Sequence, residues 1–261
     1  MEAVSLFLIG TLAGLAGSIV GLGGGFIIIP FLIFLYHVEP RLLAGTSMAV
    51  LCINSISSTI AYARQKKIDF ASGFWFGAAM IPGSIMGAIF SKALSRHLFY
   101  TIFGLIVLSV SVFLLMKPRI PAKNILPATV TRKMTNDGET VVFSYHRGFG
   151  LIVSFMTGFL SSLLGIGGGS ILVPAMVLLM SFPAHIATAT SMFIILISSC
   201  IGTITHIILG NVVWHLVFFL AIGAFLGGQA GARIAAKLPA KTLLRSLAIT
   251  LVFMSIRIMT E

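Results

Sequence analysis

Two glycine clusters interrupt the longest apolar runs of this sequence, GLGGG at residues 21–25 and GIGGG at 165–169. Each glycine in a helix is less favourable than alanine by roughly 0.8–1 kcal/mol, so both clusters predict helix breaks. We expect Gly24 and Gly168 to adopt φ > 0, which valine does not tolerate. The half-helices that follow, 26–36 and 170–180, would direct unpaired backbone N–H groups and the positive ends of their dipoles at the breaks. This pattern predicts an anion site that contains Gly23, Gly24, Gly25, Gly167, Gly168 and Gly169.

Two other apolar runs, 42–63 and 186–209, carry many hydroxyl and amide side chains. Ser47, Asn54 and Ser58 are spaced i, i+7 and i+11, which places them on one face of a helix. These side chains could bond to carbonyls and neighbouring helices, or they could bind a small, oxygen-rich solute beside the glycine breaks. The candidate substrate-binding residues of the two runs are Thr46, Ser47, Asn54, Thr190, Ser191 and Ser198.

Acid–base and metal chemistry have few candidate residues inside the apolar runs. All six carboxylates lie at the termini, at the ends of runs or in a polar linker, and the runs contain no HExxH motif, acidic pair or Ser/His/Asp set. An intramembrane hydrolase and a metal transporter are therefore excluded, and we expect no catalytic residue, metal or cofactor. His206 is the candidate internal proton carrier, and a hydrogen-bonded structural role is the alternative.

The composition identifies the elements that must position these residues. Of the 261 residues, 58% are hydrophobic and only 9% are charged, whereas a soluble domain has about 25% charged residues. These values exclude a soluble enzyme and a disordered chain, and they predict an all-α polytopic membrane protein. The net charge of +11 fits basic cytoplasmic loops better than nucleic-acid binding, because no basic face is interleaved with aromatic residues that could stack on bases.

Eight apolar blocks follow one another along the chain, and one polar linker separates the first four from the last four. The blocks cover 4–36, 42–63, 70–91, 97–116, 148–180, 186–209, 212–235 and 241–259. Within the linker, Asp137-Gly138 lies between two β-branched runs, which predicts a small β-hairpin. We therefore divide the chain into a membrane repeat at 1–116, a basic cytoplasmic linker at 117–147 and a second membrane repeat at 148–261.

The two membrane segments are related by an internal sequence repeat. Residues 14–30 match residues 158–174 at an offset of 144 (158 − 14), and the same offset, without a gap, places the TSM sequence at 46–48 on the TSM sequence at 190–192. Because one register holds over about 70 residues of the first half, the chain is built from two homologous halves.

The basic residues decide how the two glycine-broken blocks cross the membrane. If all eight blocks cross, the two sides hold 10 and 7 Lys and Arg residues, whereas re-entrant hairpins at the first and fifth blocks give a split of 13 to 4. The second split obeys the positive-inside rule better. We therefore predict six full spans plus two re-entrant hairpins, both termini outside, and an inverted-topology repeat. Eight transmembrane helices, arranged four and four, are the alternative.

Three sequence features together point to a known family. They are the doubled GxGGGxxxxP elements that end at Pro30 and Pro174, the two TSM sequences, and the PGSIMGA sequence at 82–88. In these features the chain resembles the sulfite exporter TauE/SafE family over both halves but not over the linker. The resemblance implies an integral membrane transporter of sulfite, organosulfonates or related sulfur anions. The second half departs from the first at 225–228, where FLGG replaces IPGS.

The residues and the resemblance together predict a secondary transporter of the cytoplasmic (inner) membrane. It would move small sulfur-containing anions by alternating access, at a site midway across the bilayer between the two repeats. A passive anion channel is the alternative, and a membrane subunit or chaperone without a solute is a third interpretation. The expected partners are a small anionic substrate and the lipid bilayer, without nucleic acid, and the chain could act as a monomer or as a homodimer.

Overall fold

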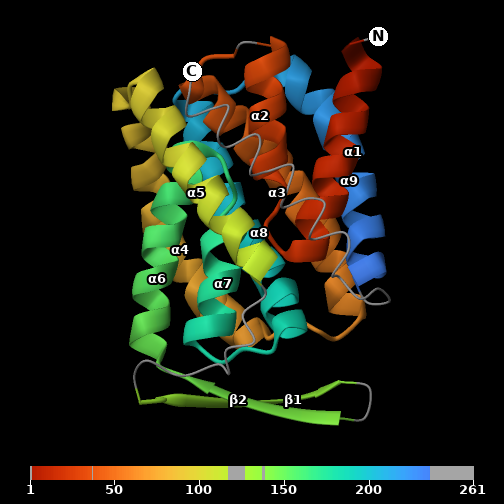
Figure 1. The fold of residues 1–261 in the computed structure, drawn as a ribbon, viewed down its shortest axis with the longest axis vertical. Coiled ribbons are helices and arrows are strands. Elements are labelled where there is room, and N and C mark those ends of the chain that lie inside the picture. Colours follow the sequence, from red (N-terminus) through yellow and green to blue (C-terminus); the bar gives the residue numbers. More distant parts are fainter. Residues whose placement is uncertain (1, 37, 117–126, 137–138, 236–261) are drawn as a thin grey trace.

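The computed structural model describes residues 2–36, 38–116, 127–136 and 139–235. Figure 1 shows a bundle of long helices with a two-stranded β-hairpin across one end. We call this the hairpin end and the opposite end, where α1 begins, the N-terminal end. In chain order the elements are α1 (Glu2–Val20), α2 (Gly25–Tyr36), α3 (Pro40–Arg64), α4 (Phe70–Phe90), the short 3₁₀ helix η1 (Ser91–Ala93), α5 (Arg96–Met116), β1 (Val130–Asn136), β2 (Glu139–Tyr145), α6 (Arg147–Leu164), α7 (Gly169–Leu179), α8 (Ala184–Ile208) and α9 (Trp214–Ala235).

Among the described residues, six helices are long and apolar enough to cross a membrane: α1, α3, α4 together with η1, α6, α8 and α9. The chain is therefore an all-α polytopic membrane protein, as the composition predicts. The predicted set of full spans differs from these six in part. The prediction counted α5, which is 21 residues long, as a full span. It also counted the block at 241–259, which lies outside the described residues. The prediction assigned α1 and α6 to the re-entrant hairpins instead.

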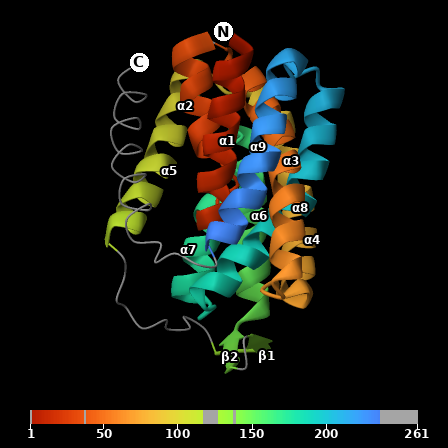
Figure 2. The same cartoon turned by 90° about the vertical axis from the view of Figure 1, so that its right-hand side faces the viewer.

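Each glycine-broken block folds back on itself. In Figures 1 and 2, α1 runs from the N-terminal end of the bundle toward its middle, and α2 returns to the same end. Accordingly, Ser5 near the start of α1 hydrogen-bonds Tyr36 at the end of α2, at 3.3 Å. The helices α6 and α7 form the corresponding pair at the hairpin end (Figure 1). The two pairs open toward opposite ends of the bundle, as an inverted repeat requires; the side of the membrane that each end faces stays a prediction.

Small residues let the two halves pack closely against each other. α1 packs against α9, and α6 packs against α4. A methyl group on Gly14 of α1 would overlap the Ala224 carbonyl of α9, and one on Gly158 of α6 would overlap the Met80 carbonyl of α4. Gly158 lies 144 residues after Gly14, and Ala224 lies 144 residues after Met80. The same backbone contact therefore occurs twice, once in each pair of helices, and it depends on glycine in both.

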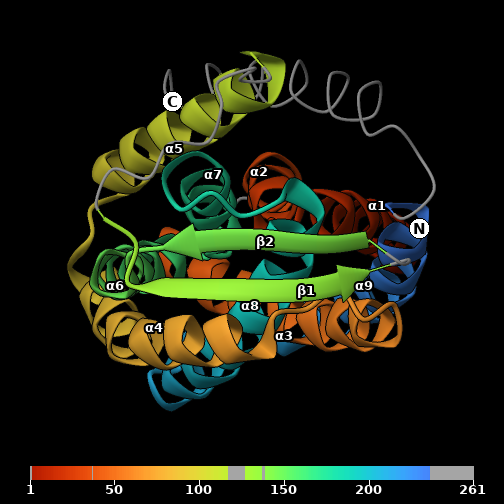
Figure 3. The ribbon, with the colours of Figure 1, turned by 90° about the horizontal axis from the view of Figure 1, so that it is seen from below.

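The predicted β-hairpin is present, and apolar side chains fix it to the bundle. β1 and β2 pair antiparallel, with Arg132 opposite Phe143, and Figure 3 shows the two strands lying across the end of the helices. Phe143 and Tyr145 are buried, and the Phe143 ring lies 4.5 Å from that of Phe182, in the connection between α7 and α8. Because isolated hairpins are marginal in water, this contact explains why the strands form.

Candidate functional site

The two glycine breaks meet each other inside the bundle. A methyl group on Gly25 would overlap the Gly165 carbonyl, and one on Gly169 would overlap the Gly21 carbonyl. Gly165 lies 144 residues after Gly21, and Gly169 lies 144 residues after Gly25. All four residues are buried. Each break therefore packs on the equivalent break of the other half, and the predicted glycine residues share one location.

Backbone conformation distinguishes the glycine residues of the breaks. Gly23, Gly24 and Gly167 have φ of +89°, +102° and +86°, which favours glycine. Gly168 has φ of −59°, so the expectation of φ > 0 there is wrong. The second break makes its left-handed turns at Gly165 and Gly167, and at Gly168 the chain has already entered helical conformation. A methyl group on Gly168 would meet the side chains of Met80 and Thr157 rather than backbone.

Three of the predicted polar residues bond directly to the breaks. Ser47 Oγ donates to the Gly165 carbonyl at 2.7 Å, and Ser191 Oγ donates to the Gly21 carbonyl at 2.8 Å. These two bonds are equivalent in the repeat and run across the halves, from α3 to the second break and from α8 to the first. Asn54 Nδ2 donates to the Gly23 carbonyl at 2.6 Å. The polar faces of α3 and α8 therefore hold the unwound backbone, which would otherwise leave buried carbonyls without donors.

Ser198, the equivalent of Asn54, has a different partner. Its Oγ hydrogen-bonds Ser84 Oγ of α4 at 2.6 Å. The residue of α9 equivalent to Ser84 is Gly228, whose added methyl group would come within 2.5 Å of Asn54 Oδ1. A large Asn54 thus faces a glycine, whereas a small Ser198 faces a serine. The large Asn54 side chain therefore requires glycine at position 228, where the first half has Ser84. This packing explains one difference between the FLGG and IPGS sequences.

Thr46 and Thr190 do not join the other candidates at the breaks. Thr46 Oγ1 accepts a hydrogen bond from Val213 N just before α9, at 3.0 Å. Thr190 Oγ1 accepts one from Asp69 N just before α4, also at 3.0 Å. Both threonines are fully buried. Each bond connects the start of a helix in one half, α9 or α4, to the polar face of α3 or α8 in the other half. Their observed contacts are therefore structural.

His206 is fully buried, and its ring contacts the end of α6. Its Nε2 lies 2.9 Å from the Ser162 carbonyl oxygen, and its Nδ1 lies 3.5 Å from Asn211 Nδ2. The equivalent residue of the first half is Tyr62, whose hydroxyl donates to the Ser18 carbonyl at 2.7 Å. Both side chains secure the helix that precedes a glycine break. These contacts favour the structural alternative for His206, and a proton-carrying role stays a prediction.

Sequence reasoning missed a contact between the two cysteines. Cys52 Sγ of α3 lies 3.1 Å from Cys200 Sγ of α8, and the equivalent serines Ser55 and Ser199 face each other at 3.3 Å. Ser55 and Ser199 occupy equivalent positions of the two halves. Their contact therefore lies at the pseudo-twofold axis that relates the halves. The cysteines are separated by 148 residues rather than 144, so the repeat gave no signal for their contact, whereas it could have indicated that of the serines.

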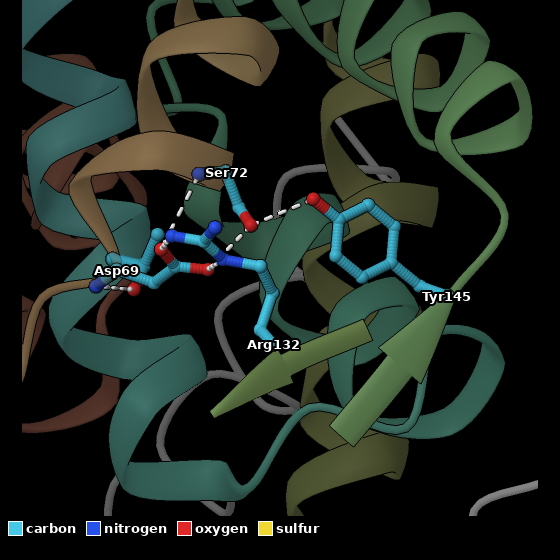
Figure 4. Close-up of polar contacts among 5 residues, drawn as sticks. Asp69, Ser72, Arg132 and Tyr145 are labelled. Carbon is cyan, nitrogen blue, oxygen red and sulfur yellow. Dashed lines mark hydrogen bonds and ion pairs between the residues drawn. The ribbon is translucent and has the colours of Figure 1, made fainter. Parts of the chain in front are cut away.

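A second polar cluster lies at the hairpin end, around Asp69 (Figure 4). The Asp69 side chain is 1% exposed and forms an ion pair with Arg132 of β1, whose Nη2 lies 2.9 Å from Asp69 Oδ1. Asp69 also accepts hydrogen bonds from Ser72 N at 3.4 Å and from the Ser72 hydroxyl. The sequence places Asp69 correctly at the end of a span, but it does not reveal the partner, because Arg132 comes from the linker 63 residues away.

Tyr145 of β2 completes this cluster. Its hydroxyl lies 2.7 Å from Ser72 Oγ, and burial raises the pKa of the Tyr145 phenol above its usual value. The hydroxyl is therefore neutral at physiological pH and can act as a hydrogen-bond donor. Its ring also packs on Phe182, with centroids 5.1 Å apart. The cluster therefore joins both strands to the bundle, beside the connection between α7 and α8.

Metal binding has no support in the part of the chain that the structure describes. Those residues include no group of three or more His, Cys, Asp or Glu side chains that could hold an ion. The polar groups at the breaks are hydroxyl, amide and backbone groups, which suit a hydrogen-bonded anion or solute better than a metal.

Comparison with known proteins gives a consistent assignment. A sequence profile described as "Sulfite exporter TauE/SafE" matches residues 6–258. The "Probable membrane transporter protein YunE" of Bacillus subtilis is 40% identical over 222 residues, which are 82% of this chain and 81% of that protein. A "Probable membrane transporter protein" of Methanocaldococcus jannaschii, MJ0441, is 25% identical over 208 residues, 77% of this chain and 71% of that protein. No solved structure matches this chain. The chain is a multi-pass membrane transporter that belongs to the sulfite exporter TauE/SafE family.

Proposed function

We propose that this transporter moves small sulfur-containing anions, such as sulfite or an organosulfonate, across the cytoplasmic membrane. The binding site in this proposal is the contact between the two glycine breaks, at the interface of the repeats. Transport proceeds by alternating access, in which the two halves move relative to each other and expose the breaks first to one side and then to the other.

The paired breaks carry this proposal. The backbone N–H groups of Gly25 and Gly169, at the starts of α2 and α7, donate to no acceptor among the described residues. Unpaired N–H groups at a helix start bind anions, and the helix dipole adds to the attraction. α2 and α7 begin on opposite sides of the contact between the two breaks. When the halves separate slightly, the N–H groups of both helices could therefore bind the same small anion.

The surrounding side chains suit an oxyanion. Ser47, Ser191 and Asn54 already touch the breaks, and each could rotate a donor toward a bound anion in exchange for its carbonyl partner. Hydrogen bonds from neutral donors bind a small oxyanion without a buried cation, which would be expensive in the membrane interior. Sulfite, a sulfonate group and thiosulfate all present three oxygens on one sulfur, so this chemistry supports the class rather than one member.

Reconstitution into liposomes tests the proposal directly. Purified protein is tested for uptake of sulfite, sulfate, thiosulfate, sulfoacetate and taurine, with and without a proton gradient. We expect saturable uptake of at least one sulfur anion, and a loss of affinity by roughly one to two decades in Ser191→Ala, since a hydrogen bond to a charged ligand contributes about 1.5–3 kcal/mol. Ser109→Ala, which removes an exposed hydroxyl of α5, is the control.

Two outcomes would contradict the proposal. Uptake that does not saturate, together with anion currents in a planar bilayer, would favour the passive channel. Absence of uptake for every sulfur anion, in liposomes where the protein retains its thermal unfolding transition, would exclude the substrate class.

A further inference from the structure

A polar pocket at the N-terminal end of the bundle carries a concentrated positive charge. The pocket has a volume of about 320 Å³, and it is lined by Glu39, Pro40 and Arg41 at the start of α3, by Ser91, Lys92 and Leu94 near η1, and by Arg96 at the start of α5. The helix starts that line it, those of α3 and α5, lie at the opposite end of the molecule from the β-hairpin (Figure 2).

The cations in this pocket outnumber their carboxylate partners. Arg41 Nε lies 2.9 Å from Glu39 Oε2, and both side chains are more than half exposed. Lys92 and Arg96 take part in no ion pair with the described residues. The pocket therefore holds a net positive charge. It is also small, at the lower limit of about 300–1,000 Å³ for ligand sites, which suits a small anion.

Two helix starts add to the positive potential. α3 begins at Pro40 and α5 begins at Arg96, so the positive ends of both helix dipoles lie at the pocket. The Ser91 hydroxyl donates to the Ala88 carbonyl at 2.7 Å, and it is therefore already occupied. The side chains that remain available to an anion are those of Arg41, Lys92 and Arg96.

The distribution of basic residues makes this concentration unusual. Of the ten described Lys and Arg residues, three belong to η1 or to the starts of α3 and α5, whereas the other seven lie in the last turns of α3 and α9, just after α3, in β1 or at the start of α6. All three, Arg41, Lys92 and Arg96, line the same pocket. The predicted topology places this end outside the cell, where the positive-inside rule disfavours Lys and Arg near the spans. Basic residues that persist there and converge on one cavity indicate a binding role.

The β-hairpin covers part of the corresponding connection at the other end of the repeat. The α2–α3 connection beside the pocket corresponds to the α7–α8 connection, since Phe182 lies 144 residues after Val38. Phe182 is covered by Phe143 and Tyr145 of the β-hairpin. The two ends of the bundle therefore differ: a basic pocket lies beside the α2–α3 connection, whereas the β-hairpin packs on Phe182 in the α7–α8 connection.

We propose that Arg41, Lys92 and Arg96 form an external binding site for a small oxyanion, separate from the site at the glycine breaks. The site captures the transported anion at the outer mouth, next to α3, the helix that carries Ser47 and Asn54 to the breaks. This role rests on the proposed function. The phosphate of an anionic lipid headgroup has the same chemistry, so the test must distinguish the two sources.

The test uses a local probe, Leu94→Cys, in a protein whose native cysteines are replaced by alanine. The new thiol lies in the pocket and leaves all three cations in place. Its rate of reaction with a sulfonate-bearing methanethiosulfonate is compared with that for a trimethylammonium analogue. We expect the ratio of the anionic to the cationic reaction rate to be about tenfold higher at this thiol than at a thiol in an uncharged site. This preference should disappear in Lys92→Gln/Arg96→Gln and persist in Arg64→Gln/Lys66→Gln, which removes the same charge at the hairpin end.

Protection experiments then identify the ligand. In detergent without lipid, inorganic sulfate should slow the labelling of Leu94→Cys saturably, and Lys92→Gln/Arg96→Gln should abolish this protection. Labelling slowed by phosphatidylglycerol in nanodiscs but not by sulfate would assign the site to a lipid headgroup and overturn a role in anion capture. Labelling that neither sulfate nor phosphatidylglycerol affects would overturn the site itself.

A second measurement does not depend on the cysteine variant. In liposomes, Lys92→Gln/Arg96→Gln should raise the KM for uptake at least about fivefold with little change in maximal rate, because it weakens capture outside the transport site. An unchanged KM would contradict capture of the substrate. Sulfate protection without transport of any sulfur anion would overturn the proposed function but leave this external site intact.

Discussion

At Gly24, the backbone conformation and the packing both require glycine. Its φ is +102°, and a methyl group there would lie 2.5 Å from the Ala13 carbonyl oxygen. We therefore expect Gly24→Ala to destabilise the protein by about 1–3 kcal/mol. Gly168→Ala should change stability by less than about 1 kcal/mol, since φ is −59° and the nearest atom is the mobile methyl of Met80. Thermal unfolding in detergent compares the two variants, and equal losses of stability would contradict this distinction.

The contact between Asn54 and Gly228 gives a second prediction for single residues. Gly228→Ser alone should destabilise the protein, because its new side chain would overlap the Asn54 amide. The double variant Asn54→Ser/Gly228→Ser recreates the Ser84–Ser198 arrangement of the other half, so the second change should recover part of the loss. We expect a coupling of about 1–3 kcal/mol in a double-mutant cycle. Additive effects would mean that the two residues adapt independently.

Individual residues also show where sequence reasoning reaches its limit. Ser47 and Ser191 could be selected from spacing and repetition, and both contact a glycine break. Thr46 and Thr190 have the same spacing and repetition, yet they bond to the starts of other helices. The difference is one residue along the helix, about 100° of rotation. A repeat shows which residues are equivalent but not what they face.

The β-hairpin is the element whose attachment depends most on one polar contact. Asp69→Asn removes the charge that Arg132 pairs with. Loss of one partner of a fully buried pair costs about 3–5 kcal/mol, but the Arg132 side chain is 36% exposed, and solvent screening reduces the expected loss to roughly 1–3 kcal/mol. We expect the hairpin to detach more often. Trypsin should then cleave Asp69→Asn faster after Arg132 or Lys133, in vesicles that expose the hairpin end.

A matched control for this experiment is Glu39→Gln, which removes the carboxylate of the other described ion pair. Because both partners of that pair are more than half exposed, its loss should leave cleavage at the hairpin unchanged. Equal cleavage of the Asp69→Asn variant and the parent would mean that the aromatic contacts of Phe143 and Tyr145 suffice to hold the hairpin.

The sequence predicts the hairpin itself better than its position. Turn residues and β-branched neighbours are local signals, and they fall where β1 and β2 form. Docking onto the bundle depends on residues distant in sequence, such as Phe182, and no local pattern identifies them. The same limit applies to the breaks: glycine clusters predict the interruption of each helix, whereas the contact of one break with the other is a property of the folded chain.

For the whole molecule, the offset of 144 residues is the most informative sequence feature. It relates the hydrogen bonds of Ser47 and Ser191 and the packing of Gly14 and Gly158. Two contacts that break this symmetry were not predicted from the sequence. In the part of the chain that the structure describes, the Cys52–Cys200 contact and the Asp69–Arg132 ion pair each occur once. Each gives the two halves of the transporter a difference on which a direction of transport can depend.

The topology of the second half gives the last prediction. With re-entrant hairpins, the turn at Gly210 lies on the same side of the membrane as His97, whereas eight full crossings would place it with Lys66. The structure has the turn at the N-terminal end, where Val213 N bonds to Thr46, and space around Gly210 is open. In a protein without native cysteines, Gly210→Cys and His97→Cys should react with a membrane-impermeant maleimide added to intact cells, and Lys66→Cys should react only after the membrane is opened. Joint labelling of Gly210→Cys with Lys66→Cys, and not with His97→Cys, would establish eight crossings and place the basic pocket and the β-hairpin in a different relation to the two sides of the membrane.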